Sequence, residues 1–160
     1  MYNFPDIYWA YRDKKYDDKI GSLDLETLTL YKDNKAEEKK NIGEQSVYAL
    51  GWGLNKLGCK TFIIDNIKIK DSTELIKIMF EELFKLKVNG YKLYAHNLGR
   101  FDAIFIIKIL VLLDYKVSPL WKDNAILIIK IFDPKTKQRI ILLDSLNLFK
   151  FFFKENTYFI

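Results

Sequence analysis

Two stretches of the chain, far apart in the sequence, carry acidic residues in places where acids need an explanation. Asp24 and Glu26 are separated by a single leucine, and Asp102 ends a segment that begins at Tyr94. Carboxylate oxygens are the ligands that hard divalent cations prefer, and two such cations together can cut a phosphodiester bond. If the two stretches meet in the fold, their carboxylates predict a site for divalent cations.

The first acidic pair falls within a predicted strand at residues 19–30. Asp24 and Glu26 alternate with leucines, and because side chains alternate along a strand, both acids point to one face and the leucines to the other. Two carboxylates this close repel each other, which costs stability or raises a pKa unless a cation lies between them. An edge strand with a solvated face explains the same pattern equally well.

The second segment joins a predicted strand to a predicted helix. Asn97 lies in the turn, where its amide can reach a ligand, and Gly99 allows a tight turn or a close approach of the backbone to a ligand. Phe101 either joins the core or stacks on a base of a single strand. Asp102 lies in the first turn of the helix, where an acid is favourable without any function. His96, the only histidine, is interpreted as structural, because magnesium-type cations prefer oxygen ligands.

A third segment contains Asp144, Ser145 and Leu146. Ser145 can donate a hydrogen bond to a phosphate or to a terminal sugar. A cap for a following helix is at least as good an interpretation. The residues of this segment alone therefore do not decide its role.

The elements that must position these residues follow an α/β order. A capping pattern at Asp71 and Glu74 begins the first helix, and an Asn-Gly pair at 89–90 ends it. Turn residues predict that the second and third strands, and the last two strands, form antiparallel hairpins. We expect a mixed sheet with flanking helices. The strands are expected at 19–30, 45–54, 59–65, 91–96, 125–132 and 138–143, and the helices at 71–89 and 101–115.

Length and composition place few further bounds on function. The 160 residues suit one domain with a real core, which we place at 19–160 after a lead-in segment at 1–18. The net charge of +5 suits a polyanionic partner, and the single Cys59 allows no internal disulfide. The most apolar stretch, 101–113, is too short to span a bilayer, and we see no secretory signal, so we expect no membrane association. Abundant Lys, Ile, Phe, Tyr and Asn are typical of an AT-rich coding source such as an organelle, although many bacteria share it.

Taken together, the three segments resemble the 3′–5′ exonuclease domain of family B DNA polymerases. The closer resemblance is to the protein-primed subgroup found in phages, adenovirus-like elements and linear plasmids of fungal or plant mitochondria. Residues 20–27 resemble the first exonuclease motif, and residues 94–105 resemble the second, which is an Asn, a short spacer and then Phe-Asp. Residues 144–146 resemble the Ser-Leu element that lies between the second and third motifs of this subgroup.

The resemblance implies a ribonuclease-H-like exonuclease fold and a metal-dependent proofreading activity in DNA replication. It implies that Asp24, Glu26 and Asp102 are catalytic residues that ligate two Mg²⁺ or Mn²⁺ ions in the complete enzyme. It further implies a single-stranded DNA 3′ end as substrate, a terminal protein primer as partner of the full-length enzyme, and a mitochondrial location. The single-strand contacts implied are Thr27, Asn97, Phe101, Ser145 and Leu146.

One departure from the family pattern concerns the third motif, Tyr-x-x-x-Asp, which completes the metal set. We find no match after residue 146, and the match of Tyr2 with Asp6 precedes the first motif and encloses Pro5, which argues against a helix interior. We therefore expect a partial exonuclease domain, incomplete at the C-terminus, with little or no nuclease activity of its own. The alternatives are a non-catalytic nucleic-acid-binding remnant and a decayed gene fragment without a stable fold.

Overall fold

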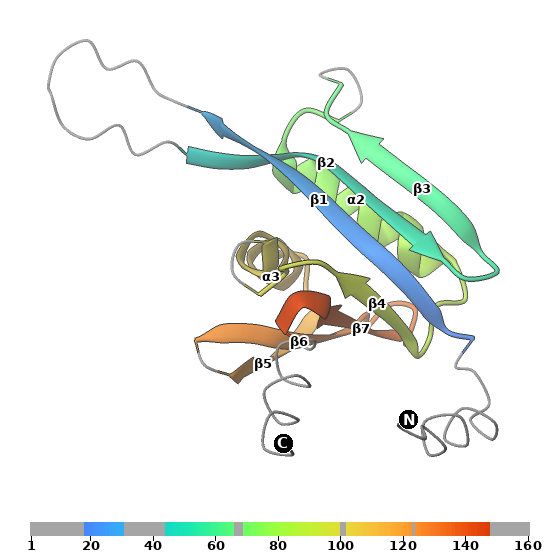
Figure 1. The fold of residues 1–160 in the computed structure, drawn as a ribbon. Helices are drawn as coiled ribbons and strands as arrows, with labels where there is room; N and C mark the ends of the chain where they lie inside the picture. Colours follow the sequence, from blue (N-terminus) through green and yellow to red (C-terminus); the bar gives the residue numbers. More distant parts are fainter. Residues whose placement is uncertain (1–17, 31–43, 66–68, 100–101, 123, 148–160) are drawn as a thin grey trace, which may run out of the picture.

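The computed structural model describes residues 18–30, 44–65, 69–99, 102–122 and 124–147 (Figure 1). The expected lead-in at 1–18 therefore lies outside the described residues, apart from Asp18. Seven strands form one mixed sheet, and two helices accompany it. The strands are β1 (Ile20–Leu30), β2 (Glu44–Leu54), β3 (Gly58–Ile63), β4 (Tyr91–Ala95), β5 (Lys116–Lys122), β6 (Ala125–Phe132) and β7 (Arg139–Asp144), and the helices are α2 (Ser72–Lys85) and α3 (Asp102–Leu112).

The order of strands across the sheet is β3-β2-β1-β4-β7-β6-β5. β1, β2 and β3 form an antiparallel ribbon, and β4 and β7 run parallel to β1 and to each other. β6 and β5 extend the sheet as antiparallel strands. The carboxyl ends of β1, β4 and β7 therefore point to the same edge of the sheet. This mixed sheet confirms the α/β fold class expected from the sequence, including both predicted hairpins.

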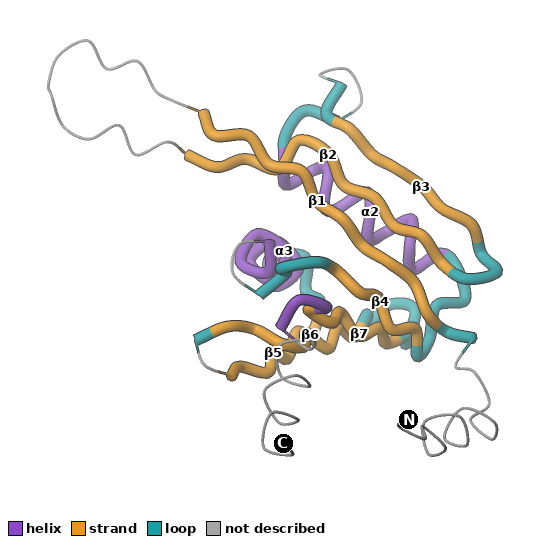
Figure 2. Tube along the Cα trace, in the orientation of Figure 1, coloured by secondary structure: helices purple, strands orange, loops and turns teal. Residues whose placement is uncertain are grey.

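The helices bury the apolar face of the sheet. α2 packs against β2 and β3 and also contacts α3, which packs against β5; Figure 2 shows α2 lying behind the β1–β2–β3 ribbon. The apolar stripe of α2 is buried, as its helical spacing predicts. On β1, Leu23 and Leu25 are buried in this core, whereas Asp24 and Glu26 are exposed on the opposite face. The predicted alternation along this strand is therefore confirmed. Among the described residues, no helix is long and apolar enough to cross a membrane.

Helix α2 begins as predicted but ends earlier. The Asp71 carboxylate accepts a hydrogen bond from the Glu74 backbone N–H at 2.8 Å, which is the expected cap. The helix stops at Lys85, before the Asn-Gly pair at 89–90 that we expected to end it. Gln138 supplies the reason, because its side-chain amide donates to the carbonyl of Phe84 at 2.8 Å and its side-chain oxygen accepts from the N–H of Val88 at 2.7 Å. The side chain of Gln138, from the connection between β6 and β7, thus makes hydrogen bonds that a further turn of α2 would otherwise make.

Strand β5 was missed in the sequence. The segment carries Pro119 and mostly exposed residues, including Leu120 and Trp121, so it lacks both the alternation and the donor pattern of a central strand. It forms because it lies at the edge of the sheet, paired only with β6, where a proline is tolerated. The preceding helix ends at Leu112 instead of 115, and Asp114 adopts a φ of 64° in the turn that follows.

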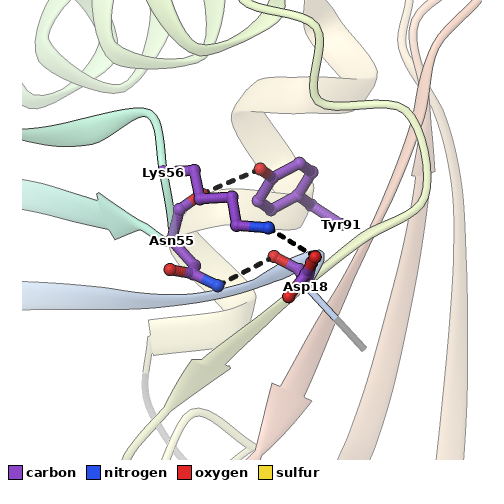
Figure 3. Close-up of polar contacts among 4 residues, drawn as sticks. All are labelled: Asp18, Asn55, Lys56 and Tyr91. Atoms are coloured by element: carbon purple, nitrogen blue, oxygen red, sulfur yellow. Dashed lines mark hydrogen bonds and ion pairs between the residues drawn. The ribbon is translucent and has the colours of Figure 1, made fainter. Parts of the chain in front are cut away.

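A polar cluster lies where β1 and β4 begin, at the end of the sheet away from the carboxyl ends of β4 and β7 (Figure 3). Lys56 forms an ion pair with Asp18, and the Asn55 side chain donates to the carbonyl of Asp18 at 3.2 Å. The Tyr91 hydroxyl donates to the carbonyl of Asn55 at 2.9 Å. These contacts tie the β2–β3 turn to the starts of β1 and β4, and thereby hold the parallel pair in register.

Candidate functional site

The register of the parallel strands brings the three chemistry-bearing segments to one edge of the sheet. Ser22 of β1 lies beside Tyr94 of β4, and Ala95 of β4 lies beside Asp144 of β7. Asp24 follows Ser22 by two residues, so it lies level with the turn that leaves β4. The connections that leave β1 and β4 also lead to opposite sides of this pair: β1 is followed by β2 on one side, and β4 is followed, after α3, by β5 on the other. In open α/β sheets, such carboxyl-terminal switch points are where ligands bind.

Asp102, at the start of α3, shares an electrostatic environment with the acids of β1. Partial burial, together with the negative charges of Asp24, Glu26 and Asp144, raises its pKa from 3.8 to about 6. The N-terminus of a helix favours an anion, so the helix opposes this shift and does not cause it. Segments distant in sequence therefore bring their carboxylates near enough to disfavour ionisation of one of them. The part of the shift that burial causes would remain in an isolated helix-start acid, but the part that the three neighbouring charges cause would not.

The positions of these side chains do not by themselves form a metal-binding shell. Within the described ranges, no group of three or more His, Cys, Asp or Glu side chains lies close enough to hold one metal ion. The donor chemistry suits a hard cation, because Asp24, Glu26 and Asp102 offer only carboxylate oxygens. Burial raises the pKa of Asp102, and the charges of Asp24, Glu26 and Asp144 raise it further; a bound cation would offset the part due to charge repulsion.

The other residues singled out in the sequence are placed unevenly around this edge. Asn97 is half-buried in the turn after β4, with a φ of 58°, and Leu146 is half-buried just after β7. The Ser145 hydroxyl donates to the carbonyl of Ala95 at 3.2 Å, which ties the two segments together. Thr27 follows Glu26 on β1 and is half-buried, at the point where the pairing of β1 with β2 shifts its register. Phe101 lies outside the described residues, and no role is assigned to it from the structure.

The environment of Asp144 was missed in the sequence. This carboxyl group is fully buried, with 0% of the residue exposed, at the end of β7. One oxygen accepts from the Gly99 N–H at 2.7 Å and from the Asn147 side-chain amide at 2.8 Å, and the other accepts from the Asn147 N–H at 3.0 Å. The sequence contained one sign of this burial, because Asp144 directly follows the apolar run 140–143 and a residue at the end of a buried strand is expected to be buried as well. The predicted cap of a helical turn is real, but Asp144 makes it instead of Ser145.

The close approach expected at Gly99 is a contact with the protein's own backbone. Gly99 is buried, and a Cβ atom at this position would lie 2.1 Å from the carbonyl oxygen of Ile126 in β6 and 3.0 Å from the Asp144 carboxylate. Any side chain larger than hydrogen would push the turn away from both. The glycine is therefore required by packing, whereas the left-handed backbone conformation in this turn belongs to Asn97.

Comparison with known proteins agrees with this arrangement of segments. The family model described as DNA polymerase type B, organellar and viral, matches residues 82–155. A protein of Agaricus bitorquis named "Probable DNA polymerase" is 44% identical over 154 residues, which cover 92% of this chain and 19% of that protein. A protein of Neurospora intermedia with the same name is 30% identical over 136 residues, which cover 80% of this chain and 14% of that protein. The chain thus spans less than a fifth of the length of these relatives. It belongs to the organellar and viral type B DNA polymerases and corresponds to one part of them.

Proposed function

We propose that this chain contributes the 3′–5′ exonuclease part of a type B DNA polymerase. In this proposal, the edge formed by the carboxyl ends of β1, β4 and β7 receives a single-stranded DNA 3′ end, and Asp24, Glu26 and Asp102 hold two Mg²⁺ or Mn²⁺ ions. The observation that carries it is the strand register, which places Asp24 level with the turn that leads from β4 to Asp102. Burial raises the pKa of Asp102, and the charges of Asp24 and Glu26 raise it further, which agrees with this placement. Carboxylates brought together from two distant segments attract cations.

A ribonuclease-H-like exonuclease fold is part of the same proposal. It is supported by a mixed sheet whose parallel strands deliver the acids to one edge, with both helices packed as one group against the apolar face. Bound divalent cations would supply activation of the attacking water and stabilisation of the departing 3′-oxygen. The chain's own groups would bind and orient the DNA end. The Ser145 hydroxyl donates to Ala95 and therefore has lone pairs left for accepting, while Leu146 offers apolar contact to a base or sugar.

We expect little nuclease activity from these 160 residues alone. The resemblance requires a fourth carboxylate from a third motif, and the described residues offer no free substitute for it. Asp144 is a further acid whose charge helps to raise the pKa of Asp102, after burial and the charges of Asp24 and Glu26, but it is enclosed and both of its oxygens already accept hydrogen bonds. Magnesium-dependent release of nucleotides from a labelled 3′ end by the purified chain would show that this expectation is wrong.

The test of the proposed site is thermal melting with and without Mn²⁺. The variant Asp24→Ala with Glu26→Ala should lose any rise in melting temperature on adding Mn²⁺, and it should fold at least as well as the wild type, because repulsion is relieved. The control variant Glu81→Ala with Asp114→Asn removes two exposed acids elsewhere and should keep the wild-type response.

Each result of that experiment has a definite meaning. A double variant of the β1 acids that keeps the full Mn²⁺ response would place the metal elsewhere and overturn the proposal. A double variant that fails to fold would show that Asp24 and Glu26 are structural. Absence of any cooperative transition in the wild type would favour a decayed gene fragment.

A second candidate function is nucleic-acid binding without catalysis. It is favoured by the net charge of +5 and by the lack, in the described part of the chain, of three acids close enough for one ion. This function predicts a melting transition that Mn²⁺ does not shift, together with oligonucleotide binding that weakens steeply as salt increases. The same melting and binding experiments therefore separate the two candidates.

The cellular setting follows from the family and is likewise a proposal. The matched family is described as organellar and viral, which supports a location in an organelle, for which we propose the mitochondrion. Replication from a terminal protein primer is proposed from the resemblance of the motifs to the protein-primed subgroup. The coding sequence should then be recovered from purified mitochondrial DNA. The DNA that carries it should bind protein at its 5′ ends, so that its electrophoretic mobility changes after protease treatment. Recovery from nuclear DNA alone would contradict this setting.

A further inference from the structure

The fully buried carboxylate of Asp144 connects the two segments that line the candidate site. In the described part of the chain, the buried charged side chains are Asp133 and Asp144. Asp133 serves only its own turn, where it accepts from the N–H groups of Lys135 and Thr136 and from the Thr136 hydroxyl. Asp144 instead reaches across 45 positions of sequence to the N–H of Gly99. A local cap does not need that contact.

Gly99, which donates to Asp144, is also packed against the backbone of β6. Gly99 lies against the β6 backbone so closely that a Cβ would come within 2.1 Å of the Ile126 carbonyl oxygen. In the first turn of α3, the Ala103 N–H donates to the Leu98 carbonyl at 2.9 Å and so connects the helix to the turn after β4. The turn after β4 is therefore fixed between β6 and Asp144, and this turn sets where α3 and its first residue, Asp102, begin.

The segment that carries Asp144 is fixed in the same way. The Asn147 N–H and side-chain amide both donate to Asp144, at 3.0 Å and 2.8 Å, and close the helical turn after β7. The Ser145 hydroxyl donates to the Ala95 carbonyl at 3.2 Å. Ala95 precedes the same turn that Gly99 ends. The two segments are thus joined by two hydrogen bonds, one on each side of the turn.

We propose that Asp144 is a positioning residue of the candidate exonuclease site. Its carboxylate fixes the turn after β4, which carries Asn97 and leads to Asp102. The position of this turn is thereby set relative to the segment that carries Ser145 and Leu146. The metal-binding and DNA-binding groups then form one rigid unit. This inference rests on the proposed function for its effect on binding, but the rigid turn itself does not depend on that function.

Asp144→Asn tests the inference while conserving the shape of the side chain. Asparagine has one acceptor oxygen where the carboxylate has two, so its NH2 group must face either the Asn147 N–H or the Gly99 N–H. The bond from the Gly99 N–H is therefore either lost or weakened, because its acceptor no longer carries a charge. We expect the Gly99 amide to exchange its hydrogen faster, and binding of Mn²⁺ and of a single-stranded oligonucleotide to weaken about 10- to 100-fold, as is usual when the partner of a ligand-bearing segment is removed. Asp144→Ser, which can still cap the N–H of Asn147 but is too short to bridge to Gly99, should show the same losses.

Asp133→Asn is the matched control. It changes a buried carboxylate with three donors in the turn at the opposite end of β7, so it should lower the melting temperature without altering either binding constant. If Asp144→Asn binds Mn²⁺ and oligonucleotide like Asp133→Asn, the inference is overturned while the proposed function stands. If the wild type binds neither, the proposed function fails instead.

Hydrogen exchange in the wild type keeps the inference testable even if the Asp144 variants do not fold. The Gly99 amide should then be among the slowly exchanging amides outside the central strands. Exchange of the Gly99 amide as fast as that of the exposed turn residue Asn124 would overturn the inference, whatever the chain binds.

Discussion

Replacing Asp102 by asparagine should stabilise the metal-free protein at neutral pH. In the folded state the pKa of Asp102 is raised from 3.8 to about 6, first by partial burial and then by the charges of Asp24, Glu26 and Asp144. A carboxyl group with a raised folded-state pKa gives stability that is fully present below 3.8 and is lost as the pH rises through about 6. Asparagine has no charge to lose and removes this pH dependence.

The size of the effect follows from opposing contributions. A shift from 3.8 to about 6 corresponds to roughly 3 kcal/mol if the group were sealed from water. Because Asp102 is only half-buried, solvent screening reduces this, and we take about 1–2 kcal/mol. Asparagine also loses the attraction of the α3 N-terminus for a charge, which is about 0.3–1 kcal/mol. We therefore expect Asp102→Asn to be more stable than the wild type by about 1 kcal/mol above the folded-state pKa.

Urea denaturation in the presence of a chelator measures this difference. The free energies of unfolding of wild type and Asp102→Asn should coincide below the ordinary pKa of 3.8, where both side chains are neutral, and diverge as the pH rises to about 6. Asp114→Asn is the control, since this aspartate is exposed just after the same helix and its φ of 64° tolerates asparagine. Adding Mn²⁺ should reverse the order at neutral pH, because only the wild type gains. An Asp102→Asn protein less stable than the wild type at neutral pH without metal would refute the electrostatic reasoning.

Two further predictions concern packing and ionisation. Gly99→Ala should lower the free energy of unfolding by about 3 kcal/mol, because the added Cβ meets the rigid Ile126 carbonyl oxygen. The control Gly51→Ala should lower it much less, because its Cβ would lie 3.3 Å from its nearest neighbour. Equal losses of the two variants in urea denaturation would contradict the packing argument. Tyr115 should ionise only near pH 12, because burial and then the charges of Asp133 and Glu81 raise its pKa; ultraviolet absorbance should show this step in the wild type and lose it in Tyr115→Phe, and a step near the ordinary value of 10 would contradict it.

The fold was predictable wherever one periodicity dominated a segment. β1 alternates leucines and acids, α2 carries a helical stripe behind a capping box, and both hairpins have clear turn residues, so all of these were found. β5 and the end of α2 were not, because each depends on a partner distant in sequence. An edge position makes Pro119 acceptable, and the Gln138 side chain replaces the last turn of α2. Local propensity contains neither fact.

The candidate site shows the same division between local and distant information. The types of Asp24, Glu26 and Asp102 suggest their chemistry from the sequence, whereas the raised pKa of Asp102 requires knowing that β1 and the start of α3 share one edge. Asp144 was read as the flank of a Ser-Leu pair because its main partner, Gly99, is recognisable only once β4 and β7 are known to be neighbours.

The parallel pairing of β4 with β7 explains why this edge suits a site of acidic groups. Ala95 and Asp144 are paired as the last residues of β4 and β7, so the chain turns away from both strands in the same place and leaves backbone N–H groups without sheet partners. The buried carboxylate of Asp144 satisfies those donors, and no cation lies among its described partners. Asp24 and Glu26 on β1 are exposed, and Asp102 at the start of α3 is half-buried, so these three acids lie closer to solvent than Asp144. In the proposed function a bound cation neutralises Asp24, Glu26 and Asp102, and for that reason their response to Mn²⁺ tests the function of this chain.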